Sequence, residues 1–253
     1  MEGIVCACGA SALELYRSSK RLIPTLLDKP RTGKVAGLMV PPRQFLEDDM
    51  TARGVTKQPY HVLVDGNHGY NPRRDIHAVA CYHPLPPRSL IKIDKGFWVT
   101  SPELTFIQIC ADEDLSDFDI ICLGYELCGT YVLDDSWDGL TCIDEPLTST
   151  EKIGRLINSI HRVPGIKRAR NLIKHVHDLS NSPMETILAM LVSLPTTKGG
   201  LGLGPISLNH PVATPRRAKT RRHRLPQTAC RTGVSRQGIP LDRSGGTRRA
   251  KAE

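Results

Sequence analysis

The chain has 253 residues and a formal net charge of +8, a length that suits one large domain or two small ones. From Thr214 to Glu253 there are twelve Lys and Arg residues and two acidic residues, which leaves 22 basic and 24 acidic residues for the rest. The rest is therefore close to neutral and offers no evident surface for a polyanion. No apolar run approaches the roughly 20 residues that cross a bilayer. No secretory signal opens the chain, so we expect a cytoplasmic protein with no membrane partner.

The eight cysteines are scattered along the chain, at positions 6, 8, 81, 110, 122, 128, 142 and 230. In a cytosolic protein such thiols stay reduced and serve as small apolar side chains. The alternative is a zinc site that uses Cys6 and Cys8. No second pair has ligand spacing, which disfavours it.

The first 100 residues change from helical to strand periodicity. Short helical patterns occupy residues 11–17 and 45–50. Residues 60–64, 76–82, 90–93 and 97–100 then alternate as strands do, and the last two flank the turn at 94–96 as in a hairpin. The sequence predicts a small antiparallel sheet over residues 60–100.

Helical patterns dominate the next part of the chain. Ser101-Pro102 opens a predicted helix at 104–111, and further helices are predicted at 118–127, 148–160 and 165–176. Residues 130–148, rich in Asp and Thr, are predicted to form a loop.

A helix with an explicit start follows at Ser182. Ser182 is a candidate N-cap, Pro183 suits the first helical position, and Glu185 is placed to complete a capping box. Five apolar residues at helical spacing predict a buried stripe: Met184, Ile187, Leu188, Leu191 and Val192. A glycine-rich loop at 199–204 and a strand at 206–212 are predicted next. From residue 213 periodicity ends, and we expect disorder.

Four stretches carry a resemblance to a known family: Trp98-Val-Thr-Ser-Pro-Glu-Leu-Thr-Phe106, Leu123-Gly-Tyr-Glu-Leu-Cys-Gly-Thr-Tyr131, Gly165-Ile-Lys-Arg-Ala-Arg170 and Ser182-Pro-Met-Glu-Thr186. Over roughly residues 60–212 the chain resembles uncharacterised bacterial proteins that join an AbiEi-like, antitoxin-type region to a domain like the very-short-patch-repair endonucleases. The resemblance implies an α/β fold with an AbiEi-like α+β region at 1–178 and the remnant of a restriction-endonuclease-like domain at 179–212. The composition adds a disordered basic tail at 213–253.

The resemblance implies Mg²⁺ as the cofactor of intact family members, in which carboxylates hold the metal and the metal activates water. Glu185 is the one family position that contributes a carboxylate here, and a capping role is its alternative. The strand Asp, the Glu-Tyr pair and the His of the family are missing after Val212. We therefore expect no retained cofactor and no catalysis in this copy.

A frameshift would explain this loss. Shifted by one nucleotide, the codon of Arg222 is compatible with Asp, the codons of Gly233-Val234 with Glu-Tyr, and those of 236–241 with Asp-Lys-Glu-Phe-His-Leu. Our hypothesis is that residues from about 214 onward are the shifted product of a nuclease domain.

Three other groups of residues fit structural roles better than metal binding, catalysis or phosphate binding. A metal cluster is possible in principle among His68, His77, His83, Asp65 and Asp75, but strand and loop histidines usually lie at the surface. Ser11 and Ser101 lie outside any nucleophile-elbow pattern. The glycines at 199–204 precede neither a P-loop Lys nor a helix.

DNA is the partner class that the basic residues favour, and no small-molecule substrate is evident. In the predicted helix at 165–176 the candidates are Lys167, Arg168, Arg170 and Lys174, with a solvated face as the alternative. In the tail they are Arg216, Arg217, Arg221 and Arg222. Three functions follow: an inactive relative of a Mg²⁺-dependent endonuclease, an antitoxin-like regulatory or DNA-binding protein acting through the first region, or nucleic-acid binding by the tail. The sequence specifies no oligomeric state.

Overall fold

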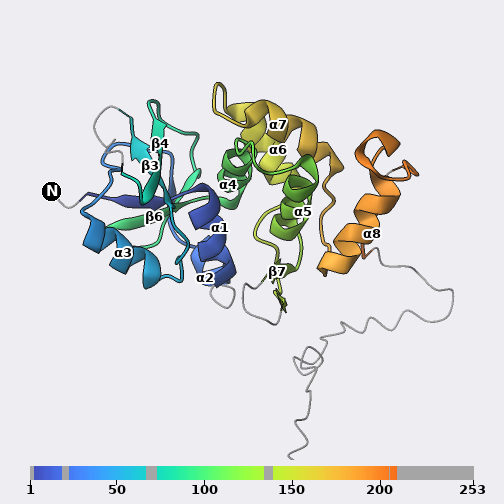
Figure 1. Cartoon of the computed structure of the whole chain (residues 1–253), viewed down its shortest axis with the longest axis horizontal. Coiled ribbons are helices and arrows are strands. Elements are labelled where there is room, and N and C mark those ends of the chain that lie inside the picture. The colour runs from blue at the N-terminus through green and yellow to red at the C-terminus, as the bar shows by residue number, and fades with distance from the viewer. Residues whose placement is uncertain (1–2, 19–22, 67–72, 134–138, 205, 210–253) are drawn as a thin grey trace, which may run out of the picture. The chain divides into compact units, whose positions relative to one another are not determined.

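The computed structural model describes residues 3–18, 23–66, 73–133, 139–204 and 206–209. Met1–His210 form one compact unit, and the boundary predicted at residue 178 falls inside it. The predicted tail, with its four candidate arginines, lies outside the described residues. The described part combines helices with a mixed sheet, so the fold is α/β as expected (Figure 1).

The sheet has six strands, in the order β2 (Arg31–Thr32), β5 (Leu90–Lys92), β6 (Phe97–Thr100), β1 (Val5–Ala7), β3 (Tyr60–Asp65) and β4 (Ile76–Cys81). The predicted hairpin of β5 and β6 is confirmed. The prediction of a purely antiparallel sheet is wrong, because β1 runs parallel to β6 and β3 runs parallel to β4. The β3–β4 connection is much longer than a two-residue hairpin turn, which leaves both strand directions open. β1, too short for a periodicity signal, lies between β6 and β3.

Three helices belong to the N-terminal part: α1 (Gly9–Ser18), α2 (Ile23–Leu27) and α3 (Arg43–Thr51). The helical patterns at 11–17 and 45–50 are thereby confirmed. α1 follows β1 directly and packs against β3, β6 and the first helix of the next group. This packing joins the sheet to the helices.

The second group contains α4 (Pro102–Ile109), α5 (Asp117–Cys128), α6 (Thr150–Ser159) and α7 (Ile166–Leu172), which continues as the 3₁₀ turn η1 (Ile173–His175). Ser101 caps α4 by accepting the Leu104 N–H, as the Ser-Pro start predicted. The predicted loop at 130–148 is partly wrong, because it contains the hairpin of β7 (Tyr131–Leu133) and β8 (Leu140–Cys142). These strands are too short to alternate visibly. No described helix is long and apolar enough to cross a bilayer.

α8 (Pro183–Ser193) has the predicted N-cap, with the Ser182 hydroxyl accepting the Glu185 N–H at 3.2 Å. The predicted capping box is not completed, because the Glu185 carboxylate accepts the Asn181 N–H instead of the Ser182 N–H. The predicted buried stripe of α8 is wrong: Met184 is 75% exposed, and Ile187, Leu188 and Leu191 are also exposed. The helix packs on α5 through its other side, where Thr186, Ala189 and Met190 are buried. The Thr186 hydroxyl fixes this orientation, because it is hydrogen-bonded to Tyr131 and Ser180 in the interior.

The segment after α8 forms the turn η2 (Thr196–Lys198) and then the glycine-rich loop. The strand predicted at 206–212 is not formed over 206–209, and 210–212 lie outside the described residues. Ile206 and Leu208 are instead half-buried against the core. They pack individually rather than pairing with a neighbouring strand.

The cysteines behave as small apolar residues. Cys6, Cys8, Cys110 and Cys128 are buried, and the seven cysteines in the described ranges are all free thiols. Burial raises the pKa of the Cys110 thiol to about 12. A protonated, buried thiol is a poor metal ligand and a poor nucleophile.

Candidate functional site

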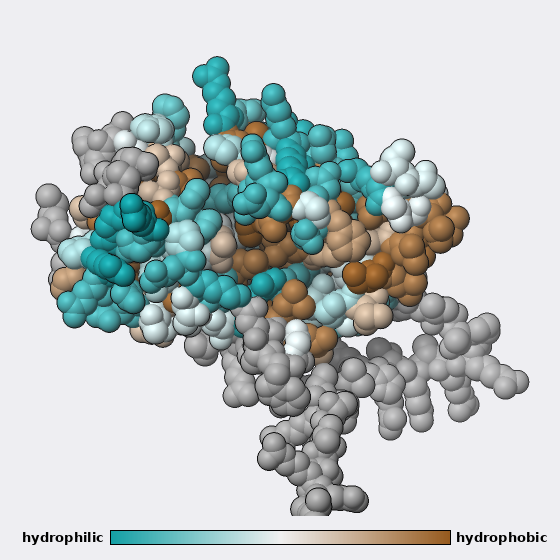
Figure 2. Space-filling view, in the orientation of Figure 1, coloured by the Kyte–Doolittle hydropathy of each residue, from teal (hydrophilic) through white to brown (hydrophobic). Residues whose placement is uncertain are grey.

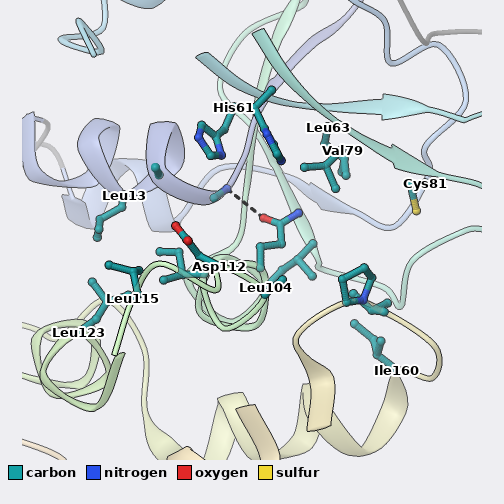
Figure 3. A pocket seen from close by; sticks show the side chains of 18 of the residues that line it. Leu13, His61, Leu63, Val79, Cys81, Leu104, Asp112, Leu115, Leu123 and Ile160 are labelled. Atoms are coloured by element: carbon teal, nitrogen blue, oxygen red, sulfur yellow. Dashed lines mark hydrogen bonds between the residues drawn. The ribbon is translucent and has the colours of Figure 1, made fainter. Parts of the chain in front are cut away.

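A cleft of about 1960 Å³ lies between the β3–β4 side of the sheet and the second group of helices. Figure 2 shows hydrophobic residues gathered in the middle of this face. The close view in Figure 3 shows leucines from α1, α4 and α5 turned toward the same space as His61 and Leu63. A cavity of a few hundred Å³ suffices for a small ligand. This one is large enough for a segment of chain.

Two parallel strands form one wall of the cleft. Their register places His61 opposite His77 and Leu63 opposite Val79, so each pair points to the same face. The two imidazoles stack, with ring centroids 4.7 Å apart and planes 25° from parallel. The wall is therefore a histidine pair followed by an apolar pair.

The start of α1 forms the floor beside this histidine pair. The Gly9 N–H donates to the Gln108 side-chain oxygen at 3.1 Å (dashed line in Figure 3). Gly9 has φ +48°, and a Cβ there would lie 3.2 Å from Nδ1 of His61. Glycine thus suits the left-handed turn into α1, and it leaves room for the imidazole to approach.

The electrostatics of the cleft keep His61 neutral. Burial lowers the pKa of His61, the neighbouring His77 lowers it further, and Asp112 across the cleft opposes the shift. A neutral imidazole costs less to bury than an imidazolium. On the helical side, Glu126 is buried and receives two hydrogen bonds from Arg17, at 2.9 and 2.7 Å. The positive charge of Arg17 therefore offsets the negative charge of Glu126 in this wall of the cleft.

The metal cluster that the sequence left as an alternative is not assembled in the described ranges, where no group of three His, Cys, Asp or Glu side chains is arranged to hold an ion. His77 stacks on His61, and Asp75 is paired with Arg73 at 3.2 Å. His68 lies outside the described residues. The serines are also structural: Ser11 accepts the N–H of His61, and Ser101 caps α4.

Glu185 acts as part of a helix cap. One carboxylate oxygen accepts the Asn181 N–H at 2.6 Å, and the Asn209 amide donates to the same carboxylate at 3.2 Å. These neighbours are hydrogen-bond donors, whereas a Mg²⁺ site needs further oxygen ligands facing the carboxylate. The surroundings of Glu185 therefore do not fit Mg²⁺, and we derive no step through the metal.

The predicted basic residues of α7 and η1 separate into two groups. Arg168 is turned inward, where it donates to Asp117 at 2.9 Å and to the backbone oxygens of Asp112 and Leu115. Arg168 is therefore held within the fold and is not part of the exposed basic row. Lys167, Arg170 and Lys174 are exposed. Their spacing of three and four residues places them on one side of the helix.

The glycine-rich loop stabilises the end of α8. Leu201 and Gly202 donate their N–H groups to the backbone oxygens of Leu191 and Leu194. A Cβ on Gly200 would lie 2.1 Å from the Leu194 oxygen, so a side chain cannot be accommodated there. The loop is therefore packed closely against the end of α8.

No family model matches the chain, and no match was found among curated proteins or among solved structures. The assignment of function therefore rests on the site itself. Sequence reasoning missed His61 and Gln108, since neither lies in a motif. The available signal was the His at the same place in two successive strands, which becomes a pair only once the register is known.

Proposed function

We propose that this chain is a non-catalytic, antitoxin-like regulatory protein that contacts the nucleic-acid backbone through α7 and η1. The observation that carries the proposal is the row of exposed cations Lys167, Arg170 and Lys174. Within the part of the chain that the structure describes, Lys167 and Lys174 have neither a hydrogen bond nor an ion pair from their side chains. Phosphate contacts need only exposed cations and fix position without reading sequence.

The electrostatics of this helix support the same conclusion. The pKa of His175 is lowered first by burial and then by the charges of Lys198 and Lys174, while Asp117 opposes the shift. Lys198 is paired with Asp117 at 2.9 Å, so of these two cations Lys174 is the one without an ion pair in the described part of the chain. A positive potential attracts phosphates before contact is made.

The contacts of Glu185 support the non-catalytic part of the proposal. Its carboxylate is held by Asn181 and Asn209 at the start of α8. Recruiting it for metal-assisted hydrolysis would break the cap. A binding role leaves the cap intact.

Binding to a fluorescently labelled 30-base-pair duplex, measured by anisotropy at several NaCl concentrations, tests the proposal. Each phosphate contact contributes about 0.9 to the slope of log K against log salt. Replacing Lys167, Arg170 and Lys174 together by Gln should therefore reduce the slope by roughly 2–3. The matched control replaces Lys34, Arg74 and Lys95, which are exposed on the sheet part. Equal slopes for both triple variants would contradict the proposal.

A further variant separates the tail from the helix. Replacing Arg216, Arg217, Arg221 and Arg222 by Gln in the full chain should leave the contribution of α7 measurable. If that variant alone abolishes salt-dependent binding, the tail is the nucleic-acid-binding element and α7 presents a solvated face.

We also propose that the chain descends from a Mg²⁺-dependent endonuclease family and has lost the activity. The formation of a capped α8 over the family-like Ser182-Pro-Met-Glu-Thr186 stretch favours this origin. The gene's nucleotide sequence from the codon of His210 onward is the test. An alternate frame with Asp, Glu-Tyr and Phe-His codons supports descent, and an early stop in that frame contradicts it.

A further inference from the structure

Six exposed apolar side chains lie together on α8 and on the segment that follows it, and we call them the α8 face. Figure 2 shows a hydrophobic area over the α8 end of the helical group. Their exposed fractions are 75% for Met184, 43% for Ile187, 60% for Leu188, 48% for Leu191, 56% for Leu201 and 71% for Leu203. Isolated exposed leucines are ordinary, but a contiguous group of this size marks an interaction site.

The backbone makes this face continuous. Met184, Ile187, Leu188 and Leu191 are spaced by three and four residues, so they share one side of α8. The N–H groups of Leu201 and Leu203 bond to the Leu191 and Val192 oxygens at 2.7 and 3.0 Å. The returning segment thus extends the same surface past the last turn of the helix.

The α8 face carries no charge. Glu185 is the one charged residue in Pro183–Ser193, and Asn181 and Asn209 hold its carboxylate at the start of the helix. An occupant that brought charged groups onto this surface would leave them desolvated and unpaired. The face therefore fits an uncharged apolar surface like itself.

We propose that the α8 face is the interface of a two-fold symmetric dimer of this chain. In a two-fold contact the same patch meets itself. Two antiparallel α8 helices place Met184 of one copy near Leu191 of the other, with Leu188 close to the axis. Opposed helix dipoles in this arrangement do not repel each other.

The area of the face agrees with a dimer. At roughly 100 Å² for each exposed side chain, the six residues present about 600 Å². Two copies then bury on the order of 1,200 Å², which reaches the lower end of specific protein interfaces. The interface is small, so the dimer depends on each large side chain at its centre.

The chain's own C-terminal segment is the competing occupant, because the described chain ends at Asn209 beside the start of α8. From Thr214 to Glu253 that segment has twelve Lys and Arg residues and no aromatic residue. Covering the face would bring these cations against an uncharged surface. Charge complementarity thus favours a second copy.

Sedimentation velocity of the nucleic-acid-free full chain, in 0.5 M NaCl over a hundredfold concentration range, tests the proposal. The mass should rise from 27.9 kDa to twice that value. Leu188→Glu should raise the dimer dissociation constant at least 100-fold, because the substitution buries two like charges near the axis. Phe45→Glu on α3, where Phe45 is 67% exposed, is the matched control and should leave dimerisation unchanged.

Met184→Glu provides a second variant, at the most exposed position of the α8 face, and should weaken the dimer as well. Circular dichroism at the same temperature verifies that each variant is folded. A wild-type chain that stays monomeric throughout, or that forms larger polydisperse species, overturns the proposal. So does a dimer that persists in both α8 variants.

Discussion

His61 and His77 stack on neighbouring parallel strands, with ring centroids 4.7 Å apart, at the wall of the cleft. Two protonated imidazoles at this separation would repel each other. Burial lowers the pKa of His61 and the neighbouring His77 lowers it further, so the stability of the fold should respond to pH in the range where histidines titrate.

The chain should lose stability as the pH falls below about 6.5, the pKa of an unfolded histidine. Burial is the first cause of the lowered pKa at His61, His175 and His177. Between the folded and unfolded pKa values the unfolded state binds more protons, so the free energy of unfolding decreases as protons are added. Below the folded pKa values this loss ends. Urea unfolding at pH 7.5 and 5.5 measures the difference.

His61→Asn should reduce that pH dependence, because one of the three groups no longer titrates. His83→Asn, a change at an exposed position, serves as the control. An equal difference between pH 7.5 and 5.5 in the wild type and in His61→Asn would show that His61 is not linked to folding.

The Arg17–Glu126 pair should be a strong contributor to stability. Glu126 is 2% exposed and Arg17 21%, with two hydrogen bonds between them. Arg17→Met leaves a buried carboxylate without its cation, which should cost about 3 kcal/mol. Arg155→Met breaks the exposed pair with Glu151 and should cost less than about 0.5 kcal/mol. Similar losses in both variants would contradict this assignment.

Removing the cap of α8 should destabilise the fold independently of Mg²⁺. Ser182→Ala should cost about 1 kcal/mol, because the Glu185 N–H loses its acceptor. Glu185→Gln keeps an oxygen for the Asn181 N–H and should cost less. Thermal unfolding with and without 10 mM Mg²⁺ gives the comparison. A Mg²⁺-dependent rise in Tm that Glu185→Gln abolishes would instead make Glu185 a metal ligand.

Sequence reasoning succeeded where the signal was local. The Ser-Pro starts of α4 and α8 and the β5–β6 hairpin depend on residues within a few positions of one another. It failed where the answer depends on distant partners. β1 is recognisable only through its pairing with β6 and β3. The direction of β4 depends on a connection that local turn chemistry does not determine.

The orientations of α8 and of Arg168 could not be predicted, and for a common reason. Periodicity shows that one side of α8 is apolar, but the side that packs is chosen by Thr186 and its partners Tyr131 and Ser180. Likewise, charge shows that Arg168 is basic, whereas Asp117 and two backbone oxygens decide that it points inward. The histidine pair could not be predicted for the same reason, because His61 and His77 become neighbours only through the register of β3 and β4.

Gly165 should tolerate no side chain, because it fixes how the proposed binding helix is attached. It has φ +82°, and a Cβ there would lie 2.3 Å from the Ile107 oxygen and 2.6 Å from the Ala111 nitrogen. Gly165→Ala should cost about 3–5 kcal/mol, from the left-handed conformation and from the clash with backbone atoms that cannot move aside. Gly154, inside α6 with open space around it, is the matched control, and Gly154→Ala should stabilise by about 0.5–1 kcal/mol. Urea unfolding gives both values. Two variants of equal stability would mean that the turn into α7 relaxes, and the alignment of Lys167 and Arg170 would then not depend on Gly165.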